Sequence, residues 1–167
     1  MRLLESTRFS LWLIVISLLT AHCASAESIH GRVVAIADGD TITVLDASNQ
    51  QHKIRLQGID APEKAQAFGQ KSKASLSAMV YGKPITVEWS KRDRYQRIIG
   101  VVLVDGVDCN LEQVKTGMAW WYKQYKREQT VQQRADFEAA ENQAREQRVG
   151  LWSDMEPVPP WEFRRAK

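Results

Sequence analysis

The chain has 167 residues, which is enough for one domain with a sizeable core and too few for several. Hydrophobic residues make up 44% and charged residues 26%, as in an ordinary globular protein. The formal net charge of +3 comes from 23 basic and 20 acidic residues, and this balance excludes a protein that coats nucleic acid through a general excess of positive charge. Any phosphate chemistry must therefore depend on a local site.

The first 26 residues have the three parts of a secretory signal peptide. Arg2 and Arg8 give a basic start, residues 11–19 are apolar, and Ala24-Ser25-Ala26 matches an A-x-A cleavage site. The apolar run is about half of the ~20 residues needed to cross a bilayer, which argues against a membrane anchor. We therefore expect cleavage after residue 26 and an exported protein, periplasmic or extracellular, with no stable membrane association.

Removal of this segment leaves residues 27–167, with a net charge of +2 and a single cysteine, Cys109. A lipoprotein signal ending at Cys23 is the alternative, but His22 stands where such a signal needs a small residue. Cys109 lies in an apolar stretch with no histidine near it in sequence. That setting is typical of a small buried hydrophobe rather than a nucleophile.

Short β-branched segments bounded by turn residues predict five strands, and longer periodic segments predict three helices. Hairpin turns are expected at Asp38-Gly39 and at residues 47–50, and Asn110 is expected to cap the second helix. In chain order the expected elements are strands at 29–37, 41–46 and 51–57, a helix at 66–81, strands at 85–89 and 98–104, and helices at 111–116 and 130–148.

This order of elements predicts an α+β domain that is mainly a β-barrel. We expect a five-stranded Greek-key barrel of the OB type with three helices, over residues 27–152. A β-sandwich is less favoured because three helices need a surface on which to pack. Residues 153–167 are expected to form an irregular C-terminal tail whose Trp161 and Phe163 pack on the body.

Two carboxylates are predicted to meet at one end of the barrel. Asp40 stands where the second strand begins, and folding the hairpin about its turn near Ser48–Asn49 is expected to place it opposite about residue 59, beside Asp60. Two carboxylates so close repel each other unless a positive charge lies between them. Because the histidines are scattered, zinc is not favoured, and a hard cation such as calcium or magnesium is expected.

The segment from Arg55 to Glu63 follows the third strand and turns towards a helix. Arg55 lies on a strand that heads into the barrel, where its charge needs an anionic partner. A phosphate can accept two parallel hydrogen bonds from the planar guanidinium. Asp60 and Glu63 could instead be helix-start carboxylates that complement a helix dipole.

A basic loop over residues 91–97 joins two strands. Lys91 and Arg92 are interpreted as solvated, whereas Arg97 immediately precedes an apolar strand and is expected at the barrel rim. A cation, two arginines and a carboxylate together suit phosphodiester hydrolysis, because they neutralise the charge of the transition state and orient or deprotonate water.

These motifs, taken in order, resemble the staphylococcal-type thermonuclease family. The matching runs are Gly39-Asp40-Thr41, R-L-Q-G-I-D-A-P-E from Arg55, D-R-Y-Q-R from Asp93, and the later V-K-T-G-M-A-W and G-L-W. The resemblance covers about residues 31–152. It implies an OB-type barrel, one calcium ion, and hydrolysis of DNA and RNA to products that end in 3′-phosphate, by what we expect to be a monomer.

The resemblance also implies a role for each matching residue. Asp40 and Asp60 match calcium-binding carboxylates, and Ala61 matches a ligand that binds through its backbone carbonyl. Arg55 and Arg97 match phosphate-binding arginines, and Glu63 matches the general base. Arg94 and Tyr95 match positions that contact a nucleotide.

Some positions depart from the family pattern or cannot be matched. Gln96 replaces a common glycine, which can change the flexibility of its loop. A substrate-contacting tyrosine expected after the second helix cannot be assigned uniquely within residues 120–125. The rival interpretation is an inactive barrel that binds nucleic acid or protein, because a fold does not imply activity. All five charged site positions are filled here, which favours an enzyme.

Overall fold

The computed structural model describes residues 27–166; the predicted signal peptide, residues 1–26, lies outside the described residues. Its strands are β1 (Glu27–Ile36), β2 (Thr41–Asp46), β3 (Gln51–Leu56), β4 (Ile59–Asp60), β5 (Pro84–Arg92), β6 (Ile98–Val104), β7 (Val107–Asp108) and β8 (Trp120–Trp121). Its helices are α1 (Gly69–Val80), α2 (Cys109–Lys115), η1 (Lys123–Glu128), α3 (Val131–Glu146), η2 (Gly150–Ser153) and α4 (Pro160–Arg165), where η marks a 3-10 helix.

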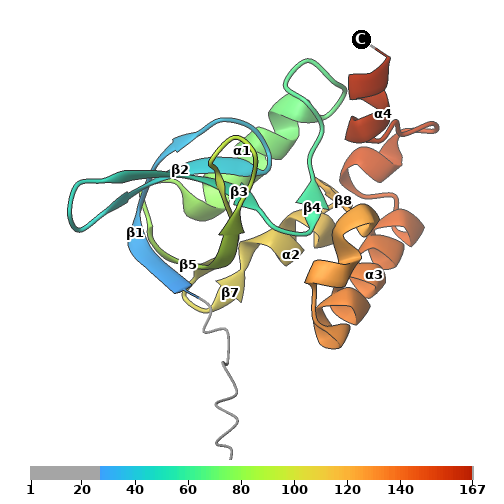
Figure 1. Cartoon of the computed structure of the whole chain (residues 1–167). Coiled ribbons are helices and arrows are strands. Elements are labelled where there is room, and N and C mark those ends of the chain that lie inside the picture. Colours follow the sequence, from blue (N-terminus) through green and yellow to red (C-terminus); the bar gives the residue numbers. More distant parts are fainter. Residues whose placement is uncertain (1–26, 167) are drawn as a thin grey trace, which may run out of the picture.

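Five of the strands close into a barrel, as the sequence predicts. The sheet runs β3-β2-β1-β5-β6, and a parallel pairing of β3 with β6, with Ile54 opposite Ile98, joins its two ends. Figure 1 shows this barrel on the left, with the helices α2 and α3 and the C-terminal segment on the right. This closure pairs residues 54–56 of β3 with β6 and shortens the edges that an open sheet would leave.

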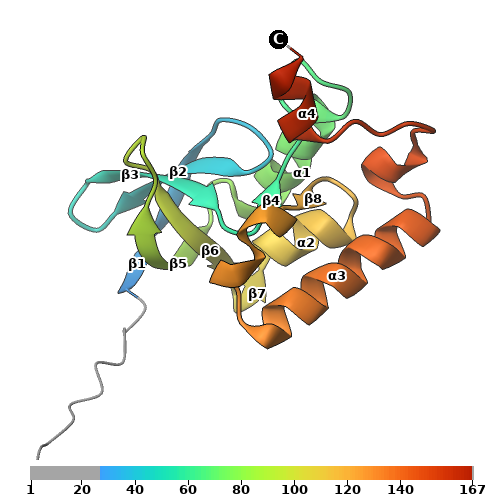
Figure 2. The same ribbon diagram turned by 45° about the vertical axis from the view of Figure 1, so that its right-hand side comes forward.

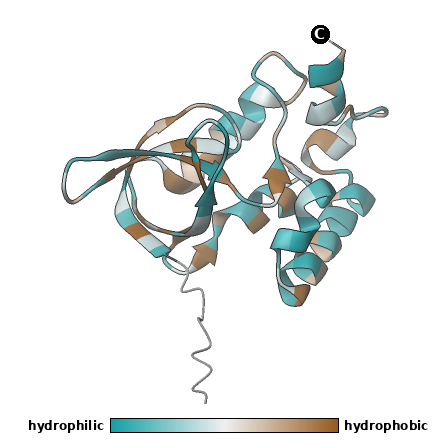
Figure 3. Ribbon diagram, viewed as in Figure 1, coloured by the Kyte–Doolittle hydropathy of each residue, from teal (hydrophilic) through white to brown (hydrophobic). Residues whose placement is uncertain are grey.

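One hydrophobic core fills the barrel and continues beneath the helices. Ile42, Ile54 and Val102 from the strands are fully buried, together with Leu76 of α1 and Val114 of α2. Figure 3 shows the brown hydrophobic residues along the barrel strands and β4, while α3 is mostly hydrophilic. The buried residues of α3 are Phe137, Ala140, Glu141 and Ala144.

Helix starts differ from the sequence prediction for local reasons. α1 begins at Gly69 rather than near Gln66, because Phe68 has a left-handed φ of 64° that a helix cannot contain. The second helix is capped by Asp108, whose side chain accepts N–H groups from the first helical turn, and not by Asn110. Asn110 is itself buried inside α2, where its amide donates to the carbonyl of Gly100. Cys109 is a buried free thiol, as predicted.

The C-terminal segment is more ordered than the predicted irregular tail. Residues 160–165 form the short helix α4, which Pro160 begins at the first helical position, where a missing N–H costs nothing. Trp161 of α4 packs against a second hydrophobic cluster that contains Trp120, Leu151 and Trp152. Figure 2 shows α4 standing above β4 and β8, on the opposite side of these strands from α3. Among residues 27–166, no helix has the length and apolar character of a membrane span.

Candidate active site

Asp40 and Asp60 form the floor of a cleft between the barrel and the C-terminal segment. They are 5% and 1% exposed, although the predicted hairpin register that brings them together is wrong. Thr41 pairs with Arg55, so Asp40 lies opposite Leu56 rather than residue 59. The chain then turns back through Gly58, whose φ is 77°, and this turn returns Asp60 to the side of Asp40.

Arg55 holds the two carboxylates together. Its Nη2 lies 3.1 Å from Asp40 and 2.9 Å from Asp60, and both side chains are nearly buried. Its Nη1 donates to the backbone carbonyls of Leu56 and Ile59, both at 2.9 Å. Four contacts therefore engage most of the five N–H groups of this guanidinium within the protein. Its role as a phosphate-binding group stays a prediction.

Neighbouring groups only partly balance the negative charge of the buried Asp40 carboxylate. Its carboxylate accepts the backbone N–H of Ala61 at 2.7 Å and the hydroxyl of Thr41 at 3.0 Å. Burial nevertheless raises the pKa of Asp40 to about 7, against the opposing effect of Arg55. A buried carboxyl with so high a pKa lies where additional positive charge would be stabilising.

The donor set around this carboxyl fits a hard cation. Asp40 and Asp60 supply carboxylate oxygens, the type of ligand that calcium and magnesium prefer. Within residues 27–166, no group of three or more His, Cys, Asp or Glu side chains is arranged to hold a metal. Two carboxylates would therefore need backbone oxygen, for which Ala61 is the sequence candidate, and water to complete the coordination.

Glu63 lies on an irregular segment, residues 61–68, between β4 and α1. Its backbone N–H donates to the side chain of Gln66 at 3.1 Å, and its carboxylate accepts Nη1 of Arg164 at 2.8 Å. Gly69 permits this path, because a β-carbon there would lie 2.0 Å from the carbonyl oxygen of Glu63. The side chain of Glu63 keeps 37% of its surface exposed, so solvent reaches it.

The loop from Asp93 to Arg97 forms the opposite wall. Burial alone would raise the pKa of Asp93, but hydrogen bonds from Arg97 and Tyr95 lower it overall. Its carboxylate accepts Nε of Arg97 at 2.7 Å, which fixes that guanidinium at the rim. Tyr95 is 64% exposed, and the guanidinium of Arg94 lies 4.8 Å from its ring centre. Gln96 has a φ of 62°, the conformation for which the family's common glycine is suited.

All eight residues predicted for the site line this one cleft, whose volume is about 630 Å³. Carboxylates, arginines and an exposed tyrosine thus share a polar hollow of the size of ligand sites. The residues are Asp40, Arg55, Asp60, Ala61, Glu63, Arg94, Tyr95 and Arg97. The structure brings them together, and their individual roles stay predictions.

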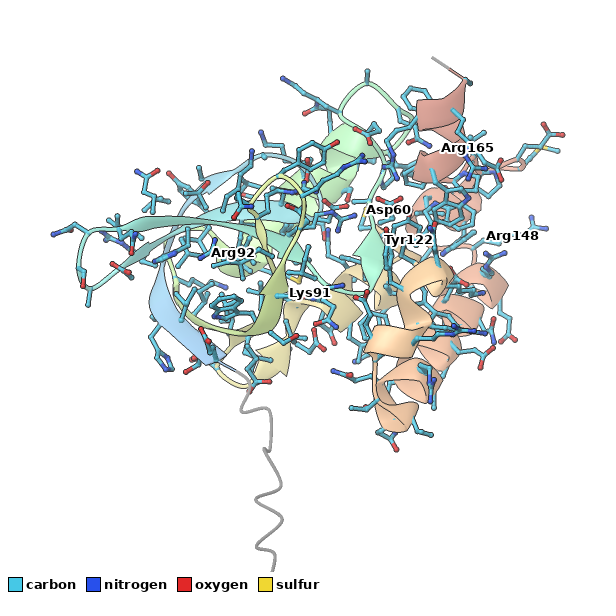
Figure 4. The ribbon with its side chains drawn as sticks, viewed as in Figure 1. Asp60, Lys91, Arg92, Tyr122, Arg148 and Arg165 are labelled. Carbon is cyan, nitrogen blue, oxygen red and sulfur yellow. The ribbon has the colours of Figure 1, made fainter. Side chains whose placement is uncertain are left out.

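The cleft also contains residues that sequence reasoning missed or left open. Tyr122 and Tyr125 line it, with ring centres 4.9 Å apart, whereas Trp120 and Trp121 are buried in the body. Lys91, interpreted above as a solvated residue, lines it as well. Figure 4 shows Tyr122 and Asp60 together between the barrel and α4, with Lys91 on the barrel side.

Arg164 is the most important residue of the cleft that the sequence analysis does not identify. It reaches the cleft from α4 and forms a two-pronged pair with Asp60, at 2.8 Å and 3.2 Å, in addition to its contact with Glu63. Nothing in an arginine near the end of a chain distinguishes it from other charged tail residues. The pair Pro159-Pro160, which forms the N-cap and first position of α4, is the signal in the sequence for a helix start.

Comparison with known proteins places the chain among nuclease relatives. The family model described as "Staphylococcal nuclease homologue" matches residues 53–154. An "uncharacterized endonuclease" of Haemophilus influenzae is 45% identical over 155 residues, which cover 93% of this chain and 83% of the relative. A protein of the same description from Escherichia coli is 46% identical over 83% of this chain and 87% of its own. A "micrococcal nuclease" of Shigella flexneri is 39% identical over 81% of this chain and 80% of its own. On the strength of these matches and of its closed barrel, the chain belongs to the staphylococcal nuclease homologue family.

Proposed function

We propose that this protein is an exported, calcium-dependent nuclease that hydrolyses phosphodiester bonds of DNA and RNA with little sequence specificity and leaves 3′-phosphate ends. The observation that carries the proposal is the convergence of Glu63, Arg97 and the Asp40–Asp60 pair in one solvent-accessible cleft. Relatives named as endonucleases and a micrococcal nuclease support the reaction class.

In this proposal, Asp40, Asp60 and the carbonyl of Ala61 hold the cation. When bound, calcium supplies positive charge against the phosphate oxygens and lowers the cost of charge that develops in the transition state. Arg97, fixed at the rim by Asp93, presents its guanidinium to the phosphate from the opposite wall. Arg55, which contacts both carboxylates, is the second arginine that would bind the phosphate.

Glu63 acts on the attacking water. Its partly exposed carboxylate accepts a proton as the water oxygen bonds to phosphorus, and the P–O5′ bond breaks. The leaving 5′-oxygen takes up a proton from solvent water to become a hydroxyl group, and the phosphate stays on the 3′-oxygen. Tyr122, Tyr125 and Tyr95 offer aromatic faces to unpaired bases, an interaction that tolerates any sequence.

The test is a cleavage assay on the mature protein, residues 27–167, with single-stranded DNA and with RNA. Each substrate is incubated with calcium, with magnesium and with a calcium chelator. We expect cutting only with a divalent cation and best with calcium, and product ends that a 3′-phosphatase alters. Glu63→Gln should lower the rate by a factor of about 100 to 10,000, the typical contribution of one general base.

The matched control is Glu138→Gln, the same change at an exposed position of α3 outside the cleft. It should cut like the wild type. A folded wild-type protein that cuts neither substrate in calcium would exclude the nuclease and leave the inactive binding barrel. Export is tested separately, by the N-terminal sequence and cell fraction of the protein made from the full chain, with a start at Glu27 expected.

A further inference from the structure

The orientation of Glu63 is not set by a helix or strand. Residues 61–68 contain turns and irregular backbone between β4 and α1, and the Glu63 side chain is more than one third exposed. A proposed general base must nevertheless stay within hydrogen-bond reach of one water molecule. Contacts from elsewhere in the chain must therefore restrict this segment.

The C-terminal segment supplies two such contacts. Gln66 bridges the chain, since its Oε1 accepts the N–H of Glu63 at 3.1 Å and its Nε2 donates to the carbonyl of Val158 at 2.6 Å. Arg164 contacts the Glu63 carboxylate directly at 2.8 Å. Both the backbone and the side chain of Glu63 are thereby connected to residues about a hundred positions later.

The helix that carries Arg164 is packed against aromatic side chains of the body. This helix, α4, is held by Trp161, which stacks on Tyr122 with a centre distance of 5.3 Å and an interplanar angle of 5°. The same indole meets Trp120 edge-on at 5.6 Å. Phe68, at the end of the Glu63 segment, packs against the cluster that contains Trp120. The C-terminal segment and residues 61–68 thus pack against the same hydrophobic cluster beside the cleft.

Arg164 also connects the irregular segment to a rigid strand. Nη1 and Nη2 of its guanidinium donate to both carboxylate oxygens of Asp60 in β4, which is 1% exposed, and Nη1 also donates to Glu63. A planar guanidinium holds two carboxylates in a fixed relative geometry better than a flexible ammonium group does.

We infer that Arg164 is a positioning residue of the nuclease site, which acts through Glu63 by fixing this carboxylate beside Asp60. The inference rests on the proposed function and adds the C-terminal helix to the active site. Groups that hold a reacting residue within a fraction of an ångström have large effects on rate, because a misplacement of 1 Å can cost about a hundredfold.

The kinetic test compares Arg164→Gln with Arg165→Gln, its neighbour on the exposed side of α4 and outside the cleft. Figure 4 shows Arg165 on this outer part of the helix. We expect Arg164→Gln to lower kcat by about 10- to 100-fold while KM changes less than threefold, and Arg164→Lys to recover part of the loss. Arg165→Gln should match the wild type.

A second measurement does not depend on activity. Hydrogen exchange of the amides in residues 61–69, followed by mass spectrometry in a chelator and in calcium, should be several times faster in Arg164→Gln than in the wild type, and unchanged in Arg165→Gln. Exchange in β2 and β6 serves as the internal reference, because a general loss of stability would accelerate these strands too.

The possible outcomes separate the two proposals. If the wild type cuts and Arg164→Gln cuts equally well or faster, the positioning role is wrong and the nuclease assignment stands. Unchanged exchange in residues 61–69 would also overturn the positioning role, whatever the rate. If the wild type does not cut, the proposed function fails, while faster exchange in Arg164→Gln would still show that the tail restrains the Glu63 segment.

Discussion

Asp40 combines deep burial with a charge that its surroundings only partly balance. Its side chain is 5% exposed, and burial raises its pKa from 3.8 to about 7 although Arg55 acts in the opposite direction. A carboxyl that binds its proton more tightly in the folded protein contributes stability at pH values below the pKa of the unfolded chain. That contribution is lost as the pH rises through the pKa of the folded state.

The calcium-free protein should therefore lose stability between pH 4 and pH 8 through Asp40. A shift of about 3 pH units corresponds to at most about 4 kcal/mol. Because Asp40→Asn cannot titrate, we expect the free energy of unfolding of the wild type, relative to this variant, to fall over that range. Denaturant unfolding in calcium-free buffer at several pH values measures the difference, and a difference that does not change with pH would contradict the assignment.

At the scale of elements, the positions of strands can be predicted from the sequence, whereas the geometry of turns and helix ends between them cannot. The strands at 41–46 and 98–104 were predicted with the bounds that the structure has, because their β-branched patterns end at clear turns. The predicted register of β2 with β3 is wrong by three residues, because the register is set by the exact geometry of the turn at residues 47–50 between the two strands. Asparagine is a residue type that often caps helices, which is why the sequence predicts a cap at Asn110. Its side-chain amide instead donates a hydrogen bond to the buried carbonyl of Gly100.

The same distinction applies to the site. Its eight predicted residues lie in three short motifs, each of which is local in sequence. Arg164 enters from α4, whose Trp161 packs against Trp120 and Tyr122, about forty residues earlier in the chain. Contacts of that kind depend on tertiary packing, and a single sequence carries no periodic signal for them.

The turn that presents Asp40 depends on close contact with α1. A β-carbon on Gly39 would lie 1.8 Å from the hydroxyl of Ser72 and 2.8 Å from the β-carbon of Ala61. We therefore expect Gly39→Ala to displace Asp40 and Ala61, to weaken calcium binding measured by calorimetry, and to lower stability by about 1–3 kcal/mol.

A double-mutant cycle tests the cause of this effect. Ser72→Ala alone should destabilise the protein, because it removes a hydrogen bond of 2.6 Å to the carbonyl of Met118. In the Gly39→Ala background the same change removes the closest clashing atom and should recover part of the loss. Additive effects in thermal unfolding would show that the clash is not with this hydroxyl.

At the scale of the whole molecule, the cleft does not have the excess positive charge expected of a surface that binds nucleic acid. Six basic side chains line it beside six carboxylates, so that the formal charges cancel. The basic residues are Arg55, Lys91, Arg92, Arg94, Arg97 and Arg164, and the acidic ones are Asp38, Asp40, Asp60, Glu63, Asp93 and Glu128. Residues 27–167 as a whole have a formal net charge of only +2.

A bound divalent cation would therefore supply a large share of the attraction for phosphates, and binding as well as cutting should depend on calcium. Glu63→Gln allows binding to be measured without cleavage, by fluorescence anisotropy of a short labelled single-stranded DNA. We expect at least tenfold tighter binding with calcium than with a chelator, and a steeper fall of affinity with salt. Adding Asp40→Asn removes one cation ligand and should abolish the calcium effect. Equal affinity with calcium and chelator in Glu63→Gln would mean that the arginines alone attract the substrate, and that the cation acts only after binding.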